Sequence, residues 1–112
     1  MTMFGNKLAK VEKLVAKGKA DALIPLTADK SEEVRLAAVR ALGRCDDDNA
    51  FNALVPLVHA SEASMRAAAI SALADMGRPT GRVHIEHQMR VEKDSQVLTA
   101  MQNALSKLKD KM

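Results

Sequence analysis

The chain has 112 residues, of which 47% are hydrophobic but only 2% aromatic, and its formal net charge is +3 at pH 7. This length fits one domain with a modest core, and the aromatic-poor, Ala-rich composition disfavours a β-sandwich and favours closely packed helices. The single cysteine, Cys45, excludes an internal disulfide. Because the sequence shows neither a signal-peptide pattern nor a long apolar run, we expect the protein to be cytoplasmic.

The first predicted element is an amphipathic helix within residues 6–18. Lysines occupy most of its polar side, as expected for a helix that caps one end of a stack of helices and leaves one side in water. The apolar residues recur at the spacing of one helical face: Leu8, Val11, Leu14 and Val15.

The first full unit is predicted over residues 20–43. It begins with a short helix that contains Pro25, which removes a backbone donor and is expected to kink or fray it. Asp29 or Ser31 in the following turn is expected to cap a second helix over residues 32–42.

The second unit, residues 48–77, repeats the first after about 31 residues. Leu-Ile-Pro-Leu at residues 23–26 returns as Leu-Val-Pro-Leu at residues 54–57. Helices are predicted over residues 50–59 and 61–74. A fixed period of this length is typical of stacked supersecondary units.

A third, weaker unit is predicted over residues 80–108. Its second helix, residues 95–109, is in register with the second helix before it, whereas residues 82–91 are ambiguous. Val83, Ile85, Met89 and Val91 alternate with polar residues, which is a strand period. We favour a degraded helix here because a lone strand among helices has no pairing partner.

The motif Val-Arg-x-Ala-Ala-x-x-Ala-Leu-Gly at residues 34–43, together with Leu-Ile-Pro-Leu, resembles the HEAT-repeat family in its short form, which is also seen in phycobilin-lyase-like proteins. The residues that carry the resemblance are Leu23, Leu26, Val34, Arg35, Ala37, Ala38, Ala41, Leu42 and Gly43, and in the second unit Leu54, Leu57, Met65, Arg66, Ala68, Ala69, Ala72 and Leu73.

The resemblance implies an all-α fold over a single domain, residues 1–112. Its architecture would be an α-α superhelix, a short right-handed solenoid of about three helix pairs with an N-terminal capping helix. The second helix of each pair would line the concave side. Arg35 and Arg66, one repeat apart, would link repeats through acidic neighbours rather than bind a ligand.

No constellation of catalytic or metal-binding residues is recognisable. His84 and His87 share a helical spacing, but His59 is the only other histidine and a metal site needs three or four ligands, so no metal or cofactor is expected. Cys45 lacks an activating partner, and the aspartates at residues 46–48 are interpreted as helix caps. The chain is therefore not expected to be an enzyme.

The function predicted is a non-enzymatic protein- or peptide-binding scaffold. The expected partner is a protein or peptide bound with modest affinity, because hot-spot aromatics are missing. The protein is expected to be a monomer, or to self-associate weakly through Leu108 or Met112 at an open end. The binding residues predicted on the concave face are Leu36, Val39, Arg40, Ala67, Ile70, Ser71, Thr99, Gln102 and Asn103.

Two alternatives stay open, a weak nucleic-acid binder and an accessory subunit of an enzyme complex. Nucleic acid is disfavoured because residues 44–77 carry two Arg against five acidic residues, which interrupts any basic stripe. The basic candidates for that role are Lys7, Lys10, Lys13, Lys17, Lys19, Arg78, Arg82 and Arg90.

Overall fold

The computed structural model describes the backbone of residues 3–109 and the side chains of residues 6–109. Within these residues all the regular secondary structure is helical and there is no strand, which confirms the all-α prediction. No described helix is both long and apolar enough to cross a membrane. In chain order the elements are α1 (Met3–Ala16), α2 (Ala20–Leu23), the 3-10 helix η1 (Ile24–Ala28), α3 (Glu32–Leu42), α4 (Asp48–Leu57), α5 (Ala63–Met76), α6 (Gly81–Met89) and α7 (Ser95–Lys109).

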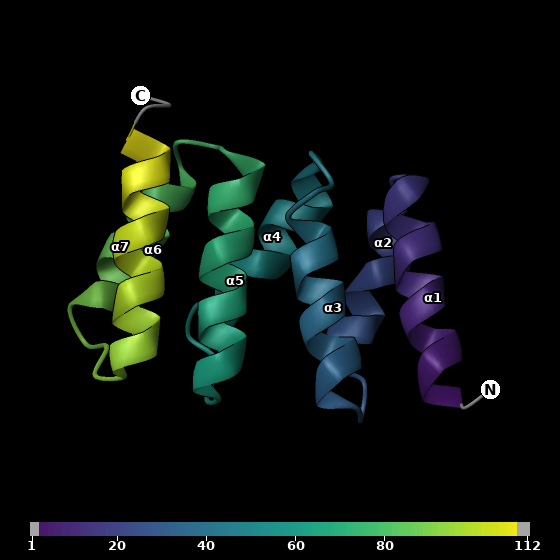
Figure 1. Ribbon diagram of the computed structural model, residues 1–112. Coiled ribbons are helices and arrows are strands. Elements are labelled where there is room, and N and C mark those ends of the chain that lie inside the picture. Colours follow the sequence, from purple (N-terminus) through teal and green to yellow (C-terminus); the bar gives the residue numbers. More distant parts are fainter. Residues whose placement is uncertain (1–2, 110–112) are drawn as a thin grey trace.

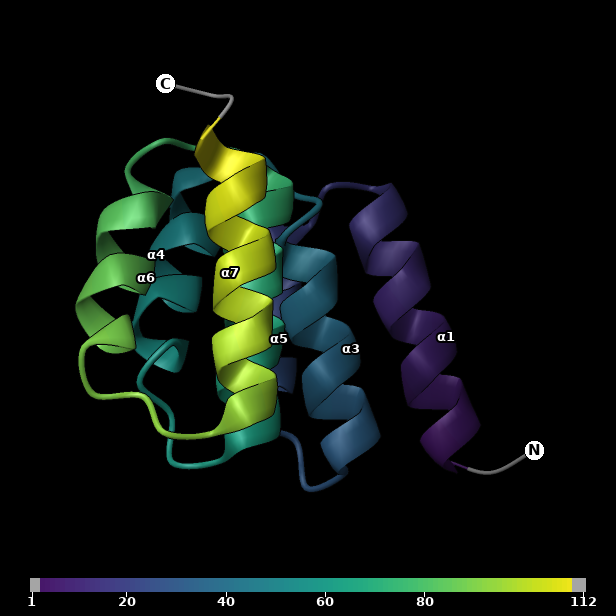
Figure 2. The same ribbon diagram turned by 60° about the vertical axis from the view of Figure 1, so that its left-hand side comes forward.

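The helices form two rows. Helices α1, α3, α5 and α7 stand side by side in that order, and α2 with η1, α4 and α6 lie behind them (Figures 1 and 2). The first repeat is therefore α2, η1 and α3, the second is α4 and α5, and the third is α6 and α7. Helix α1 occupies the place of a second helix, and it stands at one end of the front row.

Equivalent positions of the repeats share the same burial. Leu23, Leu54 and Ile85 occupy one position of the first helices, and each is fully buried. Ala38 and Ala69 are fully buried in the second helices, where their small side chains permit close packing. The core therefore runs along the stack, between the rows and between consecutive pairs, as in a solenoid.

Proline and capping residues set the observed helix ends. The predicted short helix that contains Pro25 is α2 followed by η1, because Pro25 lies at the start of the 3-10 segment. Helix α4 begins two residues before its predicted start, since the Asp47 carboxylate accepts a hydrogen bond from the Ala50 N–H at 3.1 Å. Helix α5 continues two residues past its predicted end, to the left-handed Gly77.

The ambiguous segment at residues 82–91 is helical through Met89, so the strand alternative is wrong. Ile85 is fully buried, whereas Val83 and Val91 are 64% and 66% exposed. The apparent alternation therefore combined one core residue with two surface valines.

The two repeat junctions differ at one position of their second helices. A Cβ atom added at Gly43 would lie only 2.8 Å from the Cα and carbonyl oxygen of Ala72 on α5. Gly43 is thus required by close contact between α3 and α5, not by its φ of −64°. At the next junction the equivalent position is Ala74, which is buried with its methyl group accommodated.

One position of the second helices is apolar in the first two repeats and polar in the last. Val39 and Ile70 are fully buried, but Gln102 at the same position of α7 is exposed. A side chain at this position therefore points toward the next helix pair. Leu108 is fully buried, so its predicted role as an exposed, self-associating residue is wrong; Met112 lies outside the described residues.

Candidate functional site

Shallow grooves run between consecutive second helices on the front of the molecule. One groove, of about 600 Å³, lies between α3 and α5, and one of about 360 Å³ lies between α5 and α7. Ser71 and Asp75 on α5 line both. We call this surface the second-helix face; its lining residues are Glu12, Leu36, Ala37, Arg40, Arg44, Ser64, Ala67, Ala68, Ser71, Ala72, Ala74, Asp75, Gln96, Thr99, Ala100, Asn103, Ala104 and Lys107.

Alanines form much of the floor because the helices pack through small residues. Ala68 and Ala72 are buried beneath the α3–α5 groove, while Ala37 and Ala67 are half-buried at its walls. A floor of methyl groups gives an apolar surface without filling the space above it. The grooves therefore follow from the same Ala pattern that brings the helices together.

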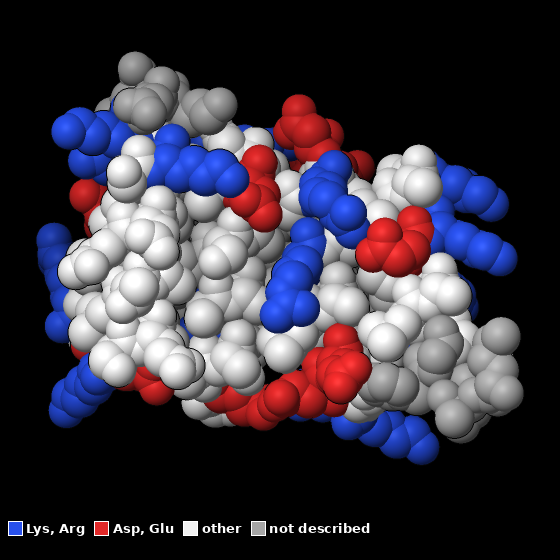
Figure 3. Space-filling view, viewed as in Figure 1, with Lys and Arg blue, Asp and Glu red and all other residues white. Residues whose placement is uncertain are grey.

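Opposite charges alternate across one edge of this face. Arg44 Nη2 lies 3.3 Å from Glu12 Oε1, and Lys107 Nζ lies 2.6 Å from Asp75 Oδ1. Arg44, Asp75 and Lys107 occupy the same position of α3, α5 and α7. Figure 3 shows red and blue side chains alternating across the upper part of the face, with largely uncharged surface over α5 and α7 below.

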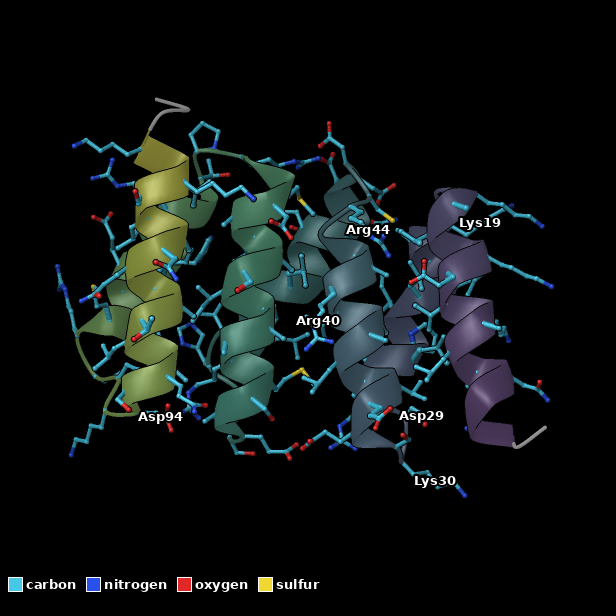
Figure 4. The ribbon with its side chains drawn as sticks, viewed as in Figure 1. Lys19, Asp29, Lys30, Arg40, Arg44 and Asp94 are labelled. Atoms are coloured by element: carbon cyan, nitrogen blue, oxygen red, sulfur yellow. The ribbon has the colours of Figure 1, made fainter. Side chains whose placement is uncertain are left out.

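Arg40 lies one turn before Arg44 and extends over the gap between α3 and α5 (Figure 4). It is exposed, and no described residue forms a hydrogen bond or ion pair with it. The equivalent residues of the later repeats are Ser71 and Asn103, which are uncharged.

Seven of the nine predicted binding residues are accessible. Those that line the grooves are Leu36, Arg40, Ala67, Ser71, Thr99 and Asn103, whereas Gln102 is exposed but lines neither groove.

The prediction is wrong for Val39 and Ile70, which are fully buried at a junction between pairs. They lie three residues after Leu36 and Ala67, and that step rotates the side chain from the second-helix face into the interface between helix pairs.

Besides Arg40, the charged residues that line the grooves were not identified from the sequence; they are Glu12, Arg44, Asp75 and Lys107. The equivalent placement of Arg44, Asp75 and Lys107, at intervals of about one repeat, is the signal that marks them.

The repeat arginines link neighbouring repeats, as predicted. Arg35 Nη1 donates to the carbonyls of Asp29 and Lys30 in its own turn, and Arg35 Nη2 lies 3.4 Å from Glu62 Oε1 of the second repeat. Arg66 Nη1 donates to the carbonyls of Ala60 and Ser61.

The link from Arg66 is the stronger of the two. Its Nε and Nη2 donate to the two oxygens of Glu92 at 2.8 and 2.9 Å, and the Glu92 side chain is only 2% exposed. The hydrogen bonds from Arg66, with further ones from Gln88 and the Asp94 N–H, lower the pKa of Glu92 to about 2 despite its burial.

Lys7 of α1 takes part in the same pattern. Its Nζ lies 2.8 Å from Asp29 Oδ1, just before the first repeat's second helix. Lys7 precedes Val11 by four residues, as Arg35 precedes Val39, so it occupies the position of a repeat arginine. Helix α1 is therefore tied to the stack by the same kind of contact as the repeats.

The histidines, the cysteine and the aspartates considered in the sequence analysis make contacts within the fold. His87 stacks edge-on to His59, and His84 to Phe51, and no group of three candidate ligands is found among the described residues. Cys45 is buried, and burial raises the pKa of its thiol. Asp47 caps α4, so the capping prediction is confirmed there.

Three of the basic residues considered for nucleic acid form ion pairs within the molecule. Lys7 pairs with Asp29, Arg78 with Asp46 and Asp48, and Arg82 with Glu86. These three cations already have acidic partners. They therefore add little to any basic stripe.

No curated protein sequence matches this chain. The sequence model of HEAT repeats matches residues 20–106, from the start of α2 to within α7. This match spans more than half of the chain and contains all three helix pairs. Proteins built from these repeats generally mediate protein–protein interaction. The chain belongs to the HEAT-repeat family.

Proposed function

We propose that this chain is a non-enzymatic binding module that holds a protein or peptide segment on the second-helix face. The observation that carries the proposal is the pair of grooves that meet at Ser71 and Asp75. We treat the two grooves and the α5 side chains between them as one track across α3, α5 and α7. Its methyl-lined floor can contact small apolar side chains, and its hydroxyl, amide and charged walls can orient a backbone.

The composition of the face sets the expected strength of binding. Aromatic side chains, which dominate strong hot spots, do not line the grooves. Binding should therefore rest on a long track of weak contacts, with an affinity in the micromolar range of about 1 μM or weaker.

The test uses Ser71→Arg, because Ser71 is exposed and lines both grooves. A long side chain there obstructs the track without entering the core, so the variant should fold normally. The matched control is Asn52→Arg, which adds the same charge at an exposed position of α4 in the other row. Both variants and the parent chain are used to capture cross-linked proteins from native extract, with quantitative mass spectrometry.

Partners bound through the second-helix face should be recovered by the parent chain and by Asn52→Arg and depleted at least about tenfold by Ser71→Arg. Equal recovery by all three chains would contradict the proposal, as would equal loss in both variants. Thermal unfolding of each variant checks that the fold is unchanged.

A further inference from the structure

One charged side chain of the α3–α5 groove has no partner among the residues that the structure describes. The other charged side chains of this groove are Glu12, Arg44 and Asp75; Arg44 pairs with Glu12, and Asp75 pairs with Lys107. Arg40 has no acidic partner among the described residues. The groove therefore offers a single uncompensated positive charge at its wall.

The surroundings of Arg40 suit a carboxylate more than a phosphate-rich polymer. A guanidinium binds a planar carboxylate through two parallel hydrogen bonds. Asp75 and Glu12 place negative charge in the same groove, which disfavours a densely anionic ligand. The hydroxyls of Ser64 and Ser71, which form no hydrogen bond to a described residue, can bind peptide backbone.

We propose that Arg40 anchors an Asp or Glu side chain of a partner peptide that lies in the α3–α5 groove, a proposal that rests on the proposed function. Small apolar side chains of that peptide pack on Ala67, Ala68 and Ala72. Neither later repeat can supply this contact, because Ser71 and Asn103 stand at the position of Arg40. The site therefore sets both the chemistry of the ligand and its register along the track.

The experiment begins with selection of binders to the full chain from a random linear peptide library. Each selected peptide is then synthesised in two forms, one with its acidic residue and one with the corresponding Asn or Gln. Calorimetric titration measures both forms against the parent chain, Arg40→Gln and Arg40→Lys. The matched control is Arg90→Gln, which removes the same charge from an exposed arginine at the end of α6.

The parent chain and Arg90→Gln should bind the acidic form about tenfold more tightly than the amide form. Arg40→Gln should bind both forms equally, and Arg40→Lys should recover part of the preference, since lysine keeps the charge but not the paired donors. A preference unchanged in Arg40→Gln would overturn the proposal, as would selected peptides without any acidic residue.

The same peptides separate this proposal from the one on which it rests. Peptides that are lost with Ser71→Arg but insensitive to Arg40→Gln leave the second-helix face as the binding site and remove only the carboxylate anchor. An empty selection, or binding that Ser71→Arg does not weaken, counts against the proposed function and against this proposal with it.

Discussion

The two junctions between repeats are built from the same positions but are held together differently. Between the first and second repeats, α3 and α5 meet at Gly43, and the arginine link to Glu62 is a single 3.4 Å contact with a half-exposed carboxylate. Between the second and third, Ala74 replaces the glycine and Arg66 forms two short contacts with the buried Glu92. The first junction thus combines a glycine contact with an exposed ion pair, and the second combines a buried alanine with a buried ion pair.

The comparison shows how a stack of repeats can vary without losing its architecture. Each junction needs a set of contacts across one interface only, because a repeat touches only its neighbours. A weak polar link can therefore serve at one junction and a strong polar link at the next.

The largest effect is expected from Gly43→Ala. The added methyl group would meet the backbone of Ala72, so α3 and α5 must separate, and the free energy of unfolding should fall by about 2–3 kcal/mol. The matched change at the other junction, Ala74→Gly, removes a methyl group and should lower it by about 1 kcal/mol, mainly through helix propensity. Urea unfolding measures both, and equal effects would contradict the steric requirement for glycine at residue 43.

Double-mutant cycles compare the two ion pairs directly. Arg66→Ala with Glu92→Ala should give a coupling energy of about 1–2 kcal/mol, because removing either partner leaves the other poorly solvated. Arg35→Ala with Glu62→Ala should give less than about 0.5 kcal/mol, as expected for an exposed pair. Similar coupling at the two junctions would show that burial of Glu92 has no energetic consequence.

Lowering the pH should first weaken the junction between the second and third repeats. The pKa of Glu92 is about 2 in the folded chain and near 4.5 when unfolded, so its contribution is complete above pH 4.5 and is lost as the pH falls toward 2. This loss should be on the order of 2 kcal/mol, after allowance for partial solvent screening. Glu92→Gln should flatten that part of the stability–pH curve, whereas Glu62→Gln should retain it.

A smaller loss of stability at low pH should persist in the Glu92→Gln variant. The Lys7 ammonium and the Ser31 N–H lower the pKa of Asp29, so its contribution also disappears on acidification.

The smallest effect is expected at the end of the stack. Gln102→Ile restores the apolar residue found at Val39 and Ile70, but on an exposed position, so stability should change by less than about 0.5 kcal/mol. The new apolar surface should instead promote self-association, which sedimentation velocity detects. A large change in stability would show that residue 102 lies within the core.

The repeat pattern predicted the second helices well because their apolar and Ala positions recur with little change. Helix α3 has its predicted bounds, and Ala38 and Ala69, which are equivalent in the repeat, are both fully buried. The pattern did not determine how each helix is rotated about its axis. Leu36 and Val39 are both apolar, so only packing reveals that one borders a groove and the other fills a junction.

The Glu92 contact could not be read from the period alone. The interval from Met65 to Val97 is one residue longer than that from Val34 to Met65, and the extra residue falls between Ile85 and Val97. The turn that contains Glu92 folds this carboxylate back onto Asp94 N–H and Arg66. A contact that depends on turn geometry has no signature in helical spacing.

Native-state hydrogen exchange of the parent chain and Glu92→Gln tests most directly whether the molecule is stabilised junction by junction. Loss of the buried pair should speed exchange in α6 and α7 and leave protection in α1 and α3 unchanged, because those helices share no junction with Glu92. Equal acceleration of exchange in all the helices would show a single cooperative core and contradict the account.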